Sequence, residues 1–306
     1  MEAEAIKTKH ALKFQIYYKS VRGTAMKQKS TKSEQRMPEQ IREHYEIEKE
    51  LANRLRYASK QERRYLYSSL YDELCRRVPL HPLLTGKLSP AATAQAVSSK
   101  MKFLRPFLNK NITFLEVGPG DCALSFEVAK FVKQVYAVDV SNEITKSSTT
   151  LENFHLILSD GCSVPVPPNS VNVAYSNQLM EHLHPDDAFE QLQHIYNALI
   201  PGGVYICITP NRLSGPHDVS MDFDAIATGF HLKEYTVLEL SNLFRKAGFK
   251  QIRACVGVKV RYISLPVFPI AMCERLLNKL PYTLRKTIGR NLPFSVLLGI
   301  RLVGVK

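Results

Sequence analysis

The sequence predicts an α/β fold built on a doubly wound, mostly parallel sheet and preceded by an N-terminal helical extension. Apolar strand patterns alternate with amphipathic helix patterns between residues 111 and 248, as is typical of parallel strands joined by right-handed crossovers. A glycine turn, Gly118-Pro119-Gly120, separates the first strand pattern from the first helix pattern. After Gly248 the alternation stops, which predicts that the sheet ends in antiparallel strands.

Length and composition predict a cytoplasmic protein with one large core. The chain has 306 residues and is 45% apolar. Its six cysteines form no Cys-x-x-Cys pair, which favours reduced thiols over a disulfide framework or a zinc site. The N-terminus lacks the pattern of a signal peptide, and no apolar run reaches the roughly 20 residues of a spanning helix.

The net charge of +13 is distributed unevenly along the chain. Residues 1–110 contain 23 Lys or Arg against 11 Asp or Glu, whereas residues 111–250 contain 8 against 16. Residues 251–306 are again basic, with 10 against 1. Such basic ends could contact nucleic acid, anionic lipid or an acidic substrate, or could simply be solvated.

The first third of the chain predicts a flexible arm followed by helices. Residues 1–36 are rich in Lys and Ser, lack periodicity, and are expected to form a flexible basic arm. Residues 37–105 are expected to form a helical cover, in which we recognise no chemistry of its own. Its helices are predicted at 39–58, at 60–77, and from Ser89-Pro90 to Phe103 after a proline-broken linker at 78–86.

Residues 106–306 are expected to form the domain that carries the sheet. Strands are predicted at 112–117, 134–140, 154–159, 170–176, 203–209, 251–260 and 297–305. Helices are predicted at 121–132, 142–151, 186–199 and 236–247, the last beginning with a capping box from Thr236 to Glu239. Residues 265–293 are predicted to be a basic helical insertion before the last strand, containing Arg275, Lys279, Arg285, Lys286 and Arg290.

The segment from Glu116 to Ala123 is a candidate nucleotide cradle. Its glycines let the backbone approach a ligand closely, and the start of the following helix presents unpaired N–H groups. Gly118, Gly120 and Ala123 satisfy the dinucleotide pattern G-x-G-x-x-G/A. The segment also resembles the first motif of the class I S-adenosylmethionine-dependent methyltransferases, an acidic-x-G-x-G-x-G pattern, except that Cys122 replaces the third glycine.

Later motifs extend this resemblance over roughly residues 100–260. Asp139 ends the second predicted strand, 19 residues after Gly120, where both families place an acid for a ribose. Asp160-Gly161 is similar to the family's adenine-contacting acid. The runs Asn177 to Leu183, which contains Glu181-His182, and Pro201-Gly202-Gly203 resemble motifs of the branch that includes quinone-ring and lipid-linked O-methyltransferases. Asn172 and Ile200 depart from that family's usual residues, at strand and helix ends.

The resemblance implies a Rossmann-like sheet of seven strands with an antiparallel last strand, and S-adenosylmethionine as cofactor. It assigns cofactor contacts to Glu116, Gly118, Gly120, Asp139, Asp160, Gly161 and Asn177. In the family the glycine backbone packs on the methionine portion, and the acid before it lies near the amino group. The acids matching Asp139 and Asp160 contact the ribose hydroxyls and the adenine, and Asn177 would lie beside the sulfonium. The alternative for both acids is helix capping or turn formation.

The acceptor must be bound by loops after the fourth and fifth strands or by the helical cover. Orientation can supply about 7–11 kcal/mol, and a general base adds roughly 10²–10⁴-fold for a hydroxyl acceptor. His231 is the first candidate base and His217 the second, with Arg212 as a candidate anion clamp on the same long loop. His182, after the fourth strand, is a further catalytic candidate. Each could equally be a packed or solvated residue.

No metal site is expected. Some quinone-ring methyltransferases of this fold bind a metal near the position of His182, and His184, Glu181 and Asp186 are close to it in sequence. However, no two of these ligands have the tight helical spacing of a metal motif.

The sequence thus predicts a methyltransferase that acts on O or N of a small-molecule or lipid-linked acceptor. An NAD-dependent oxidoreductase remains an alternative, as does a catalytically silent nucleic-acid-binding protein of the same fold. The aromatic residues of the basic ends are not interleaved with cations as a stacking platform requires, which makes nucleic acid the less favoured partner. The insertion at 265–293 is a candidate for peripheral contact with an anionic membrane.

Overall fold

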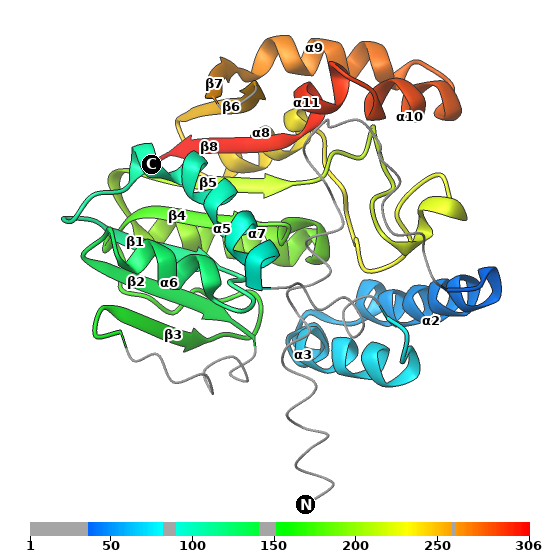
Figure 1. Cartoon of the computed structure of the whole chain (residues 1–306), viewed down its shortest axis with the longest axis horizontal. Coiled ribbons are helices and arrows are strands. Elements are labelled where there is room, and N and C mark those ends of the chain that lie inside the picture. The colour runs from blue at the N-terminus through cyan, green and yellow to red at the C-terminus, as the bar shows by residue number, and fades with distance from the viewer. Residues whose placement is uncertain (1–35, 82–89, 141–150, 259–260) are drawn as a thin grey trace, which may run out of the picture.

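The computed structural model describes residues 36–81, 90–140, 151–258 and 261–306 (Figure 1). Its centre is one mixed sheet with the strand order β3-β2-β1-β4-β5-β8-β6-β7. The strands are β1 (Thr113–Val117), β2 (Gln134–Asp139), β3 (Phe154–Leu158), β4 (Val171–Asn177), β5 (Leu199–Thr209), β6 (Gln251–Val258), β7 (Arg261–Pro266) and β8 (Ile300–Val305). Strands β1 to β5 pair in parallel, whereas β8 is antiparallel to both β5 and β6. The predicted mostly parallel α/β sheet with an antiparallel last strand is confirmed.

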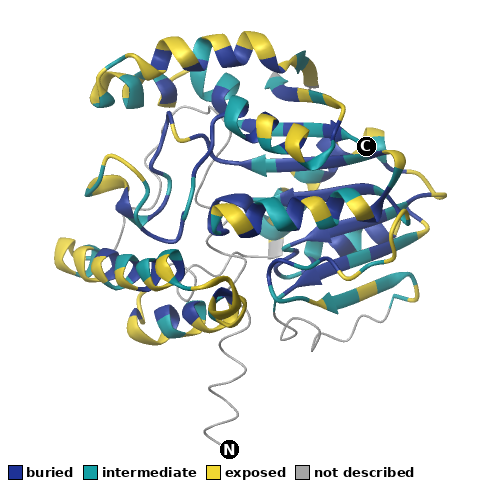
Figure 2. Ribbon diagram, turned by 180° about the vertical axis from the view of Figure 1, so that it is seen from behind, coloured by how far each residue is buried: buried dark blue, intermediate teal, exposed yellow. Residues whose placement is uncertain are grey.

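Helices cover both faces of the sheet (Figures 1 and 2). One face carries α5 (Pro90–Leu104) and α6 (Ala123–Ala129), and the other carries α7 (Pro185–Ala198) and α8 (Val237–Ala247). Successive side chains of a strand point to opposite faces. Phe114 therefore packs in the core under α5 and α6, while Leu115 packs in the core that includes residues of α7 and α8.

Capping interactions encoded in the local sequence define both ends of α8. The Thr236 hydroxyl accepts a hydrogen bond from the Glu239 N–H at 3.1 Å, and the Glu239 carboxylate accepts one from the Thr236 N–H at 2.8 Å. Gly248 ends the helix with a φ of 111°, a left-handed conformation that favours glycine. The predicted capping box and glycine stop are both present.

The N-terminal helices α2 (Pro38–Tyr57) and α3 (Lys60–Arg77) lie beyond the carboxyl ends of the parallel strands (Figure 1). Leu51 and Leu70 belong to the same buried core as the sheet residue Leu115. A buried ion pair also attaches the cover, because Arg63 donates to both carboxylate oxygens of Asp187 at 2.5 and 2.6 Å. These two helices are therefore packed onto the sheet rather than tethered to it.

The C-terminal part contains one strand that the sequence did not predict. Strand β7 pairs antiparallel with β6, so the described sheet has eight strands where seven were expected. This short edge strand was missed because it ends at Pro266, a residue that argues against a central strand. Between β7 and β8 the chain forms α9 (Val267–Asn278), α10 (Tyr282–Arg290) and α11 (Phe294–Leu298).

Some predicted elements differ at their ends or cannot be compared. The last strand begins at Ile300 rather than 297, because Leu297 and Leu298 belong to α11. The predicted helix at 142–151 and the arm at 1–36 lie outside the described residues, apart from Leu151 and Arg36.

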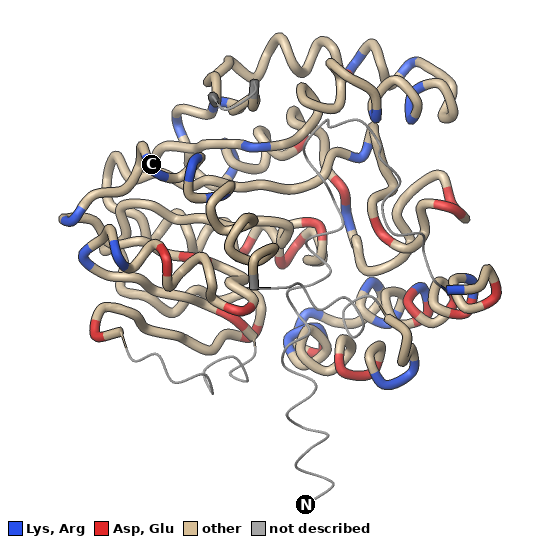
Figure 3. The backbone as a smooth tube through the Cα atoms, in the orientation of Figure 1, with Lys and Arg blue, Asp and Glu red and all other residues tan. Residues whose placement is uncertain are grey.

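Basic positions recur on α9 and α10 (Figure 3). None of the helices in the described ranges has the length and apolarity needed to cross a membrane.

Candidate active site

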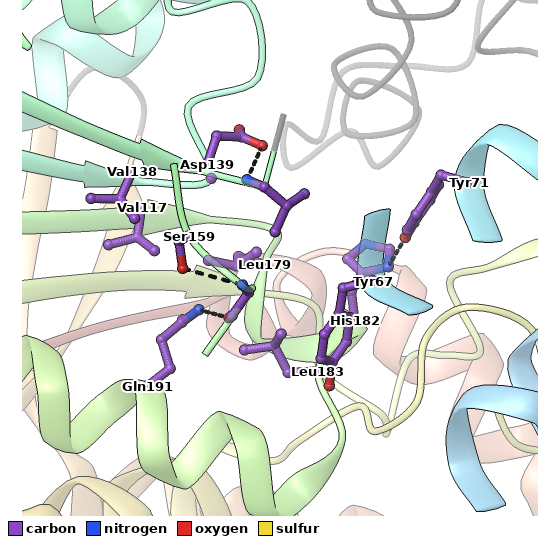
Figure 4. Close-up of a pocket in the computed structure, with 13 residues that line it drawn as sticks. Tyr67, Tyr71, Val117, Val138, Asp139, Ser159, Leu179, His182, Leu183 and Gln191 are labelled. Atoms are coloured by element: carbon purple, nitrogen blue, oxygen red, sulfur yellow. Dashed lines mark hydrogen bonds between the residues drawn. The ribbon is translucent and has the colours of Figure 1, made fainter. Parts of the chain in front are cut away.

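A pocket lies at the carboxyl ends of the parallel strands β1 to β4, against helix α3 (Figure 4). Four short segments at these strand ends line it, and α3 supplies two aromatic rings. The lining residues are Tyr67, Tyr71, Val117, Gly118, Val138, Asp139, Val140, Ser159, Gly161, Leu179, His182, Leu183 and Gln191. The pocket therefore collects Gly118, Asp139, Gly161 and His182 from the residues that the sequence singled out.

Two of the lining glycines adopt conformations that favour glycine. Gly118 has a φ of 69°, and a Cβ atom there would lie 3.2 Å from a methyl group of Leu179. Gly161 has a φ of 88°, and a Cβ atom would lie 3.0 Å from the ring of Tyr67. Both glycines thus keep the wall of the pocket free of side chains, as close approach of a ligand to the backbone requires. Cys122, at the third glycine position of the motif, has a φ of 54°, which explains why glycine is common there.

Asp139 is buried, and its carboxylate is held by backbone donors. The Val140 N–H donates to one oxygen at 2.7 Å, and the Gly120 N–H donates to the other at 3.3 Å. Each carboxylate oxygen can accept more than one hydrogen bond. The side chain is thereby fixed at the pocket wall, and a carboxylate is a suitable acceptor for the hydroxyls of a ribose.

Glu116 and Asp160 are close to the pocket but are absent from its lining. Burial raises the pKa of Glu116 to about 7, and the carboxylate accepts a hydrogen bond from the Ser125 hydroxyl at 2.6 Å. The Asp160 carboxylate accepts N–H groups of Cys162 and Ser163, which lower its pKa against the opposing effect of burial. Asp160 thus builds the turn that presents Gly161, rather than facing the pocket itself.

Gly120 and Asn177 are also absent from the lining. Gly120 acts on the pocket through its N–H group, which holds Asp139. Asn177 is the last residue of β4, at the same carboxyl edge of the sheet as the pocket.

On the acceptor side, Tyr71 and His182 lie together in the pocket (Figure 4). Nδ1 of His182 is 2.9 Å from the Tyr71 hydroxyl and 3.1 Å from the carbonyl oxygen of Phe230. Because a carbonyl oxygen only accepts, the second contact assigns a hydrogen to Nδ1 and leaves Nε2 as the acceptor nitrogen.

The protonation states of this pair follow from burial. Burial lowers the pKa of His182 well below its usual range, and the charge of His231 lowers it further. Burial also raises the pKa of Tyr71 well above its usual range, with Glu48 and Glu181 contributing. Near neutral pH the pocket therefore presents a neutral imidazole beside a neutral phenol.

His231, the first candidate base from the sequence, lies behind His182 rather than in the pocket lining. The two rings meet edge to face, with centroids 4.9 Å apart. Burial alone would lower the pKa of His231, but its 2.7 Å hydrogen bond to Glu234 and the charge of that carboxylate raise the pKa to about 9. At neutral pH His231 already carries the proton that a base would have to accept. A protonated His231 is less suited to act as the base than the neutral His182.

His217 and Arg212 are held by other contacts. Nε2 of His217 lies 3.1 Å from the carbonyl oxygen of Asn211, and burial lowers the pKa of His217. Neither His217 nor Arg212 is a lining residue. Arg212 donates to both oxygens of Glu239 at the surface. The long loop after β5 therefore supplies neither a base nor an anion clamp to this pocket.

Three groups among the described residues have the composition of a metal site, and two of these groups are fully buried. Glu181, His182 and His231 offer ligand atoms within 4.8 Å of one another. Burial raises the pKa of Glu181 to about 7, and one of its oxygens accepts from the Thr209 hydroxyl at 2.8 Å. Since His231 is protonated near pH 7, a metal ion would have to displace that proton.

The second group, His44, Glu48 and His81, lies between the cover helices and the linker after α3. Arg36 Nη1 lies 2.8 Å from His44 Nδ1, and Nε2 of that ring lies 2.9 Å from Glu48. A guanidinium can only donate, so Nδ1 accepts and Nε2 donates to the carboxylate. This proton arrangement is that of a hydrogen-bonded pair and opposes metal binding at Nε2.

The cover helices contribute chemistry that the sequence did not reveal. Tyr67 and Tyr71, four residues apart on α3, both line the pocket. Leu66, Leu70 and Leu74 recur every four residues and predict the packed side of this helix. Tyr67 and Tyr71 are also four residues apart, and this spacing places them on one side of the helix. The cover, in which the sequence indicated no functional residue, thus supplies two side chains to the pocket lining.

Comparison with known proteins defines the family. Residues 91–254, more than half of the chain, match a family described as methyltransferase domain. The chain therefore belongs to this methyltransferase family. A protein of Mycolicibacterium smegmatis (strain ATCC 700084 / mc(2)155), described as a probable S-adenosylmethionine-dependent methyltransferase, is 29% identical over 146 residues. This match covers 47% of the present chain and 54% of that relative, so the chain spans about half of the relative's length.

Solved structures with a similar fold include a SAM-dependent methyltransferase from Archaeoglobus fulgidus, at 16% identity and a TM-score of 0.47, covering 69% of this chain and 94% of that one. Another is phosphoethanolamine N-methyltransferase 2 of Haemonchus contortus in complex with S-adenosyl-L-methionine, at 17% identity and a TM-score of 0.46. This match covers 68% of the present chain and 52% of that one. The family match makes residues 91–254 a class I methyltransferase domain whose cofactor is S-adenosylmethionine. The family match also favours S-adenosylmethionine over a nicotinamide cofactor, an alternative that the glycine turn alone left open.

Proposed function

We propose that this protein transfers a methyl group from S-adenosylmethionine to an O or N atom of a small-molecule or lipid-linked acceptor. One observation carries the proposal: Tyr71 and His182 lie in the same pocket as Gly118, Asp139 and Gly161. A cofactor-binding wall and a pair of groups able to handle an acceptor proton thus face a single space.

The wall of the pocket fits the proposed cofactor. S-adenosylmethionine supplies an electrophilic methyl group when it is bound. We assign the ribose hydroxyls to Asp139, because its carboxylate lines the pocket and is held in place by the Val140 N–H. We assign close backbone contact with the cofactor to Gly118 and Gly161. Gly120 and Asp160 would act indirectly, by orienting Asp139 and by holding the turn at Gly161. Glu116 and Asn177 remain proposed cofactor residues at the edge of the same site.

His182 is the proposed proton acceptor. When an O or N nucleophile forms its bond to carbon, its own proton becomes far more acidic, so a weakly basic imidazole can remove it. Nε2 of His182 is the nitrogen with the lone pair for this step, and Tyr71 positions the ring through its contact with Nδ1. Such base assistance typically contributes about 10²–10⁴-fold.

We propose supporting rather than proton-accepting roles for the other two histidines. The imidazolium of His231 stands against the His182 ring and, after burial, is a cause of its lowered pKa. His217 donates its backbone N–H to Glu234 at 2.7 Å, the same carboxylate oxygen that holds His231. Through these contacts the two histidines would help to keep the His182 imidazole neutral and fixed in position at the pocket.

Titration calorimetry with S-adenosylmethionine and S-adenosylhomocysteine tests the proposal. We expect both to bind, and Asp139→Ala to abolish binding without loss of the folded state, which circular dichroism would check. No binding of either molecule at millimolar concentration would contradict the proposed function. The acceptor can then be identified by mass spectrometry of a host extract incubated with donor carrying a labelled methyl group.

A further inference from the structure

Helix α9 presents an apolar face to the outside of the molecule. Its inward face buries Val267, Ile270, Ala271, Glu274 and Leu277. Phe268, Met272 and Leu276 follow one another at intervals of four, so they form a stripe on the opposite face of the helix. Their side chains are 71%, 40% and 62% exposed. A surface helix normally places mostly polar residues on its outer face, whereas three large apolar side chains are exposed on this one.

The charges beside this stripe are all positive. Arg275 and Lys279 are three residues after Met272 and Leu276, so they lie on the same outward face. Both are exposed, and no ion pair joins them to another described residue. The acid of this helix, Glu274, is buried and accepts hydrogen bonds from Asn211 and Val237. An apolar stripe beside uncompensated cations is typical of helices that lie in the plane of an anionic membrane.

Neighbouring elements extend the exposed apolar surface without adding negative charge. Ile263 of the edge strand β7, just before α9, is 49% exposed, and Leu284 of α10 is 47% exposed. In Figure 2 this part of the chain lies at the outer rim of the molecule, beyond the sheet. From Tyr262 to Leu292 the sequence contains no acid other than Glu274.

Not every cation of this region is available for a partner. Lys286 donates to the carbonyl oxygen of Met221, and Arg290 donates to those of Ser214 and Pro216. These two residues fasten α10 to the loop after β5. The cations that remain beside the apolar stripe are Arg275 of α9 and Lys279, the residue that caps the C-terminus of α9.

We propose that the outer face of α9 docks on an anionic membrane surface. Phe268, Met272 and Leu276 would enter the boundary between headgroups and acyl chains, while Arg275 and Lys279 contact lipid phosphates. Charge complementarity selects this occupant over the chain's own N-terminal arm, since residues 1–35 contain eight Lys or Arg against three Glu. The proposal does not depend on the identity of the methyl acceptor.

Vesicle sedimentation of the full chain tests the docking face. We expect the protein to sediment with phosphatidylcholine vesicles that contain about a third phosphatidylglycerol, and to remain in solution with phosphatidylcholine alone. Phe268→Ser combined with Leu276→Ser should lower partitioning at least tenfold. Arg275→Glu combined with Lys279→Glu should lower it by at least about 25-fold, since loss of each cation alone removes roughly fivefold near an anionic surface and the new carboxylates add repulsion.

Matched variants distinguish membrane binding by this face from nonspecific hydrophobic or electrostatic binding. Ile226→Ser removes another exposed apolar side chain, and Lys130→Glu with Lys133→Glu reverses two cations of the methyltransferase domain away from α9. Both controls should partition like the wild type. Unchanged thermal melting and S-adenosylhomocysteine affinity would show that every variant is folded, and the latter separates this test from that of the proposed function.

Three outcomes would overturn the proposal. One is wild-type binding that is absent or equal for neutral and anionic vesicles. Another is retention of binding by both α9 double variants, which would assign binding to another part of the chain. The third is a dimer in size-exclusion light scattering that Phe268→Ser with Leu276→Ser converts to a monomer, because the stripe would then be a protein interface.

Discussion

The two halves of the pocket are built in different ways. The cofactor half consists of strand ends and turns: Gly118 follows β1 directly, Asp139 is the last residue of β2, and Gly161 lies in the turn after β3. The acceptor half consists of side chains that are distant in sequence: Tyr71 and His182 are 111 positions apart, and Glu48 accepts from the Phe230 N–H across 182. Local motifs therefore define where the cofactor binds, whereas tertiary packing of the cover defines what surrounds the acceptor.

The largest effect on cofactor affinity should come from Asp139, the proposed ribose-binding acid. We expect Asp139→Asn to weaken S-adenosylhomocysteine binding on the order of 100-fold, because hydrogen bonds to a charged group contribute about 1.5–3 kcal/mol each. Asp160→Asn should cost only a few-fold, since that side chain holds a turn instead of facing the pocket. Calorimetric affinities of the two variants check this. Equal losses would mean that Asp160 contacts the cofactor directly.

The acceptor half should make stability depend on pH. The pKa of His231 is raised to about 9 in the folded state from an ordinary value of 6.5. Its contribution to stability is therefore complete below pH 6.5 and is lost as pH rises through 9. We expect a decrease of about 3 kcal/mol in unfolding free energy over this range, from the general value of about 1.36 kcal/mol per unit of pKa.

Urea denaturation at a series of pH values would measure this decrease. Glu181, whose pKa is raised to about 7, acts in the same direction between pH 4.5 and 7. The variant His231→Gln should flatten the slope between pH 6.5 and 9. An unchanged slope in that variant would assign the pH dependence to other groups.

Crowding at the pocket wall can be separated from backbone strain. Gly161→Ala would place a methyl group 3.0 Å from the Tyr67 ring, whereas at Gly202, also with positive φ, a Cβ atom meets nothing within 4 Å. Both variants should lose about 1–2 kcal/mol of stability from the left-handed conformation. Only Gly161→Ala should also lose cofactor affinity, by about tenfold. If Gly202→Ala lost as much affinity, strain rather than crowding would be responsible.

The smallest expected effect concerns the hydroxyl of Tyr71. Tyr71→Phe removes the contact with His182 while keeping the ring, and should lower methyl transfer roughly 3–10-fold, as loss of one hydrogen bond of about 0.5–1.5 kcal/mol implies. Affinity for S-adenosylhomocysteine should not change. Tyr45→Phe is the control, because that hydroxyl donates to Asp224 outside the pocket. Label incorporated from donor into host extract gives the rate. A similar decrease in the rate of methyl transfer by Tyr45→Phe would contradict a role for the Tyr71–His182 pair.

The cofactor half was largely predictable from sequence. Glycine turns and acids at strand ends act within a few residues, so their spacing is sufficient to place Gly118, Asp139 and Gly161 at one edge of the sheet. Even there, Asp160 was assigned to the ligand although it holds the turn, because spacing cannot tell which way a side chain points.

The acceptor half was predicted poorly for a physical reason. A histidine on a loop is a plausible base until its neighbours are known, and the buried Glu234 converts His231 into a cation. Tyr71 was overlooked because its partner lies in another third of the chain. The edge strand β7 was missed for a related reason, since pairing with β6 rather than its own pattern defines it.

The most direct test of the central claim is a comparison of wild type and His182→Asn in two measurements, S-adenosylhomocysteine affinity and the rate of label transfer into host extract. If the cofactor half and the acceptor half are separate, affinity should stay within about threefold while the rate falls by about 10²–10⁴-fold, the usual contribution of a general base. An unchanged rate, or a parallel loss of affinity and rate in a folded variant, would contradict the claim that His182 serves the acceptor.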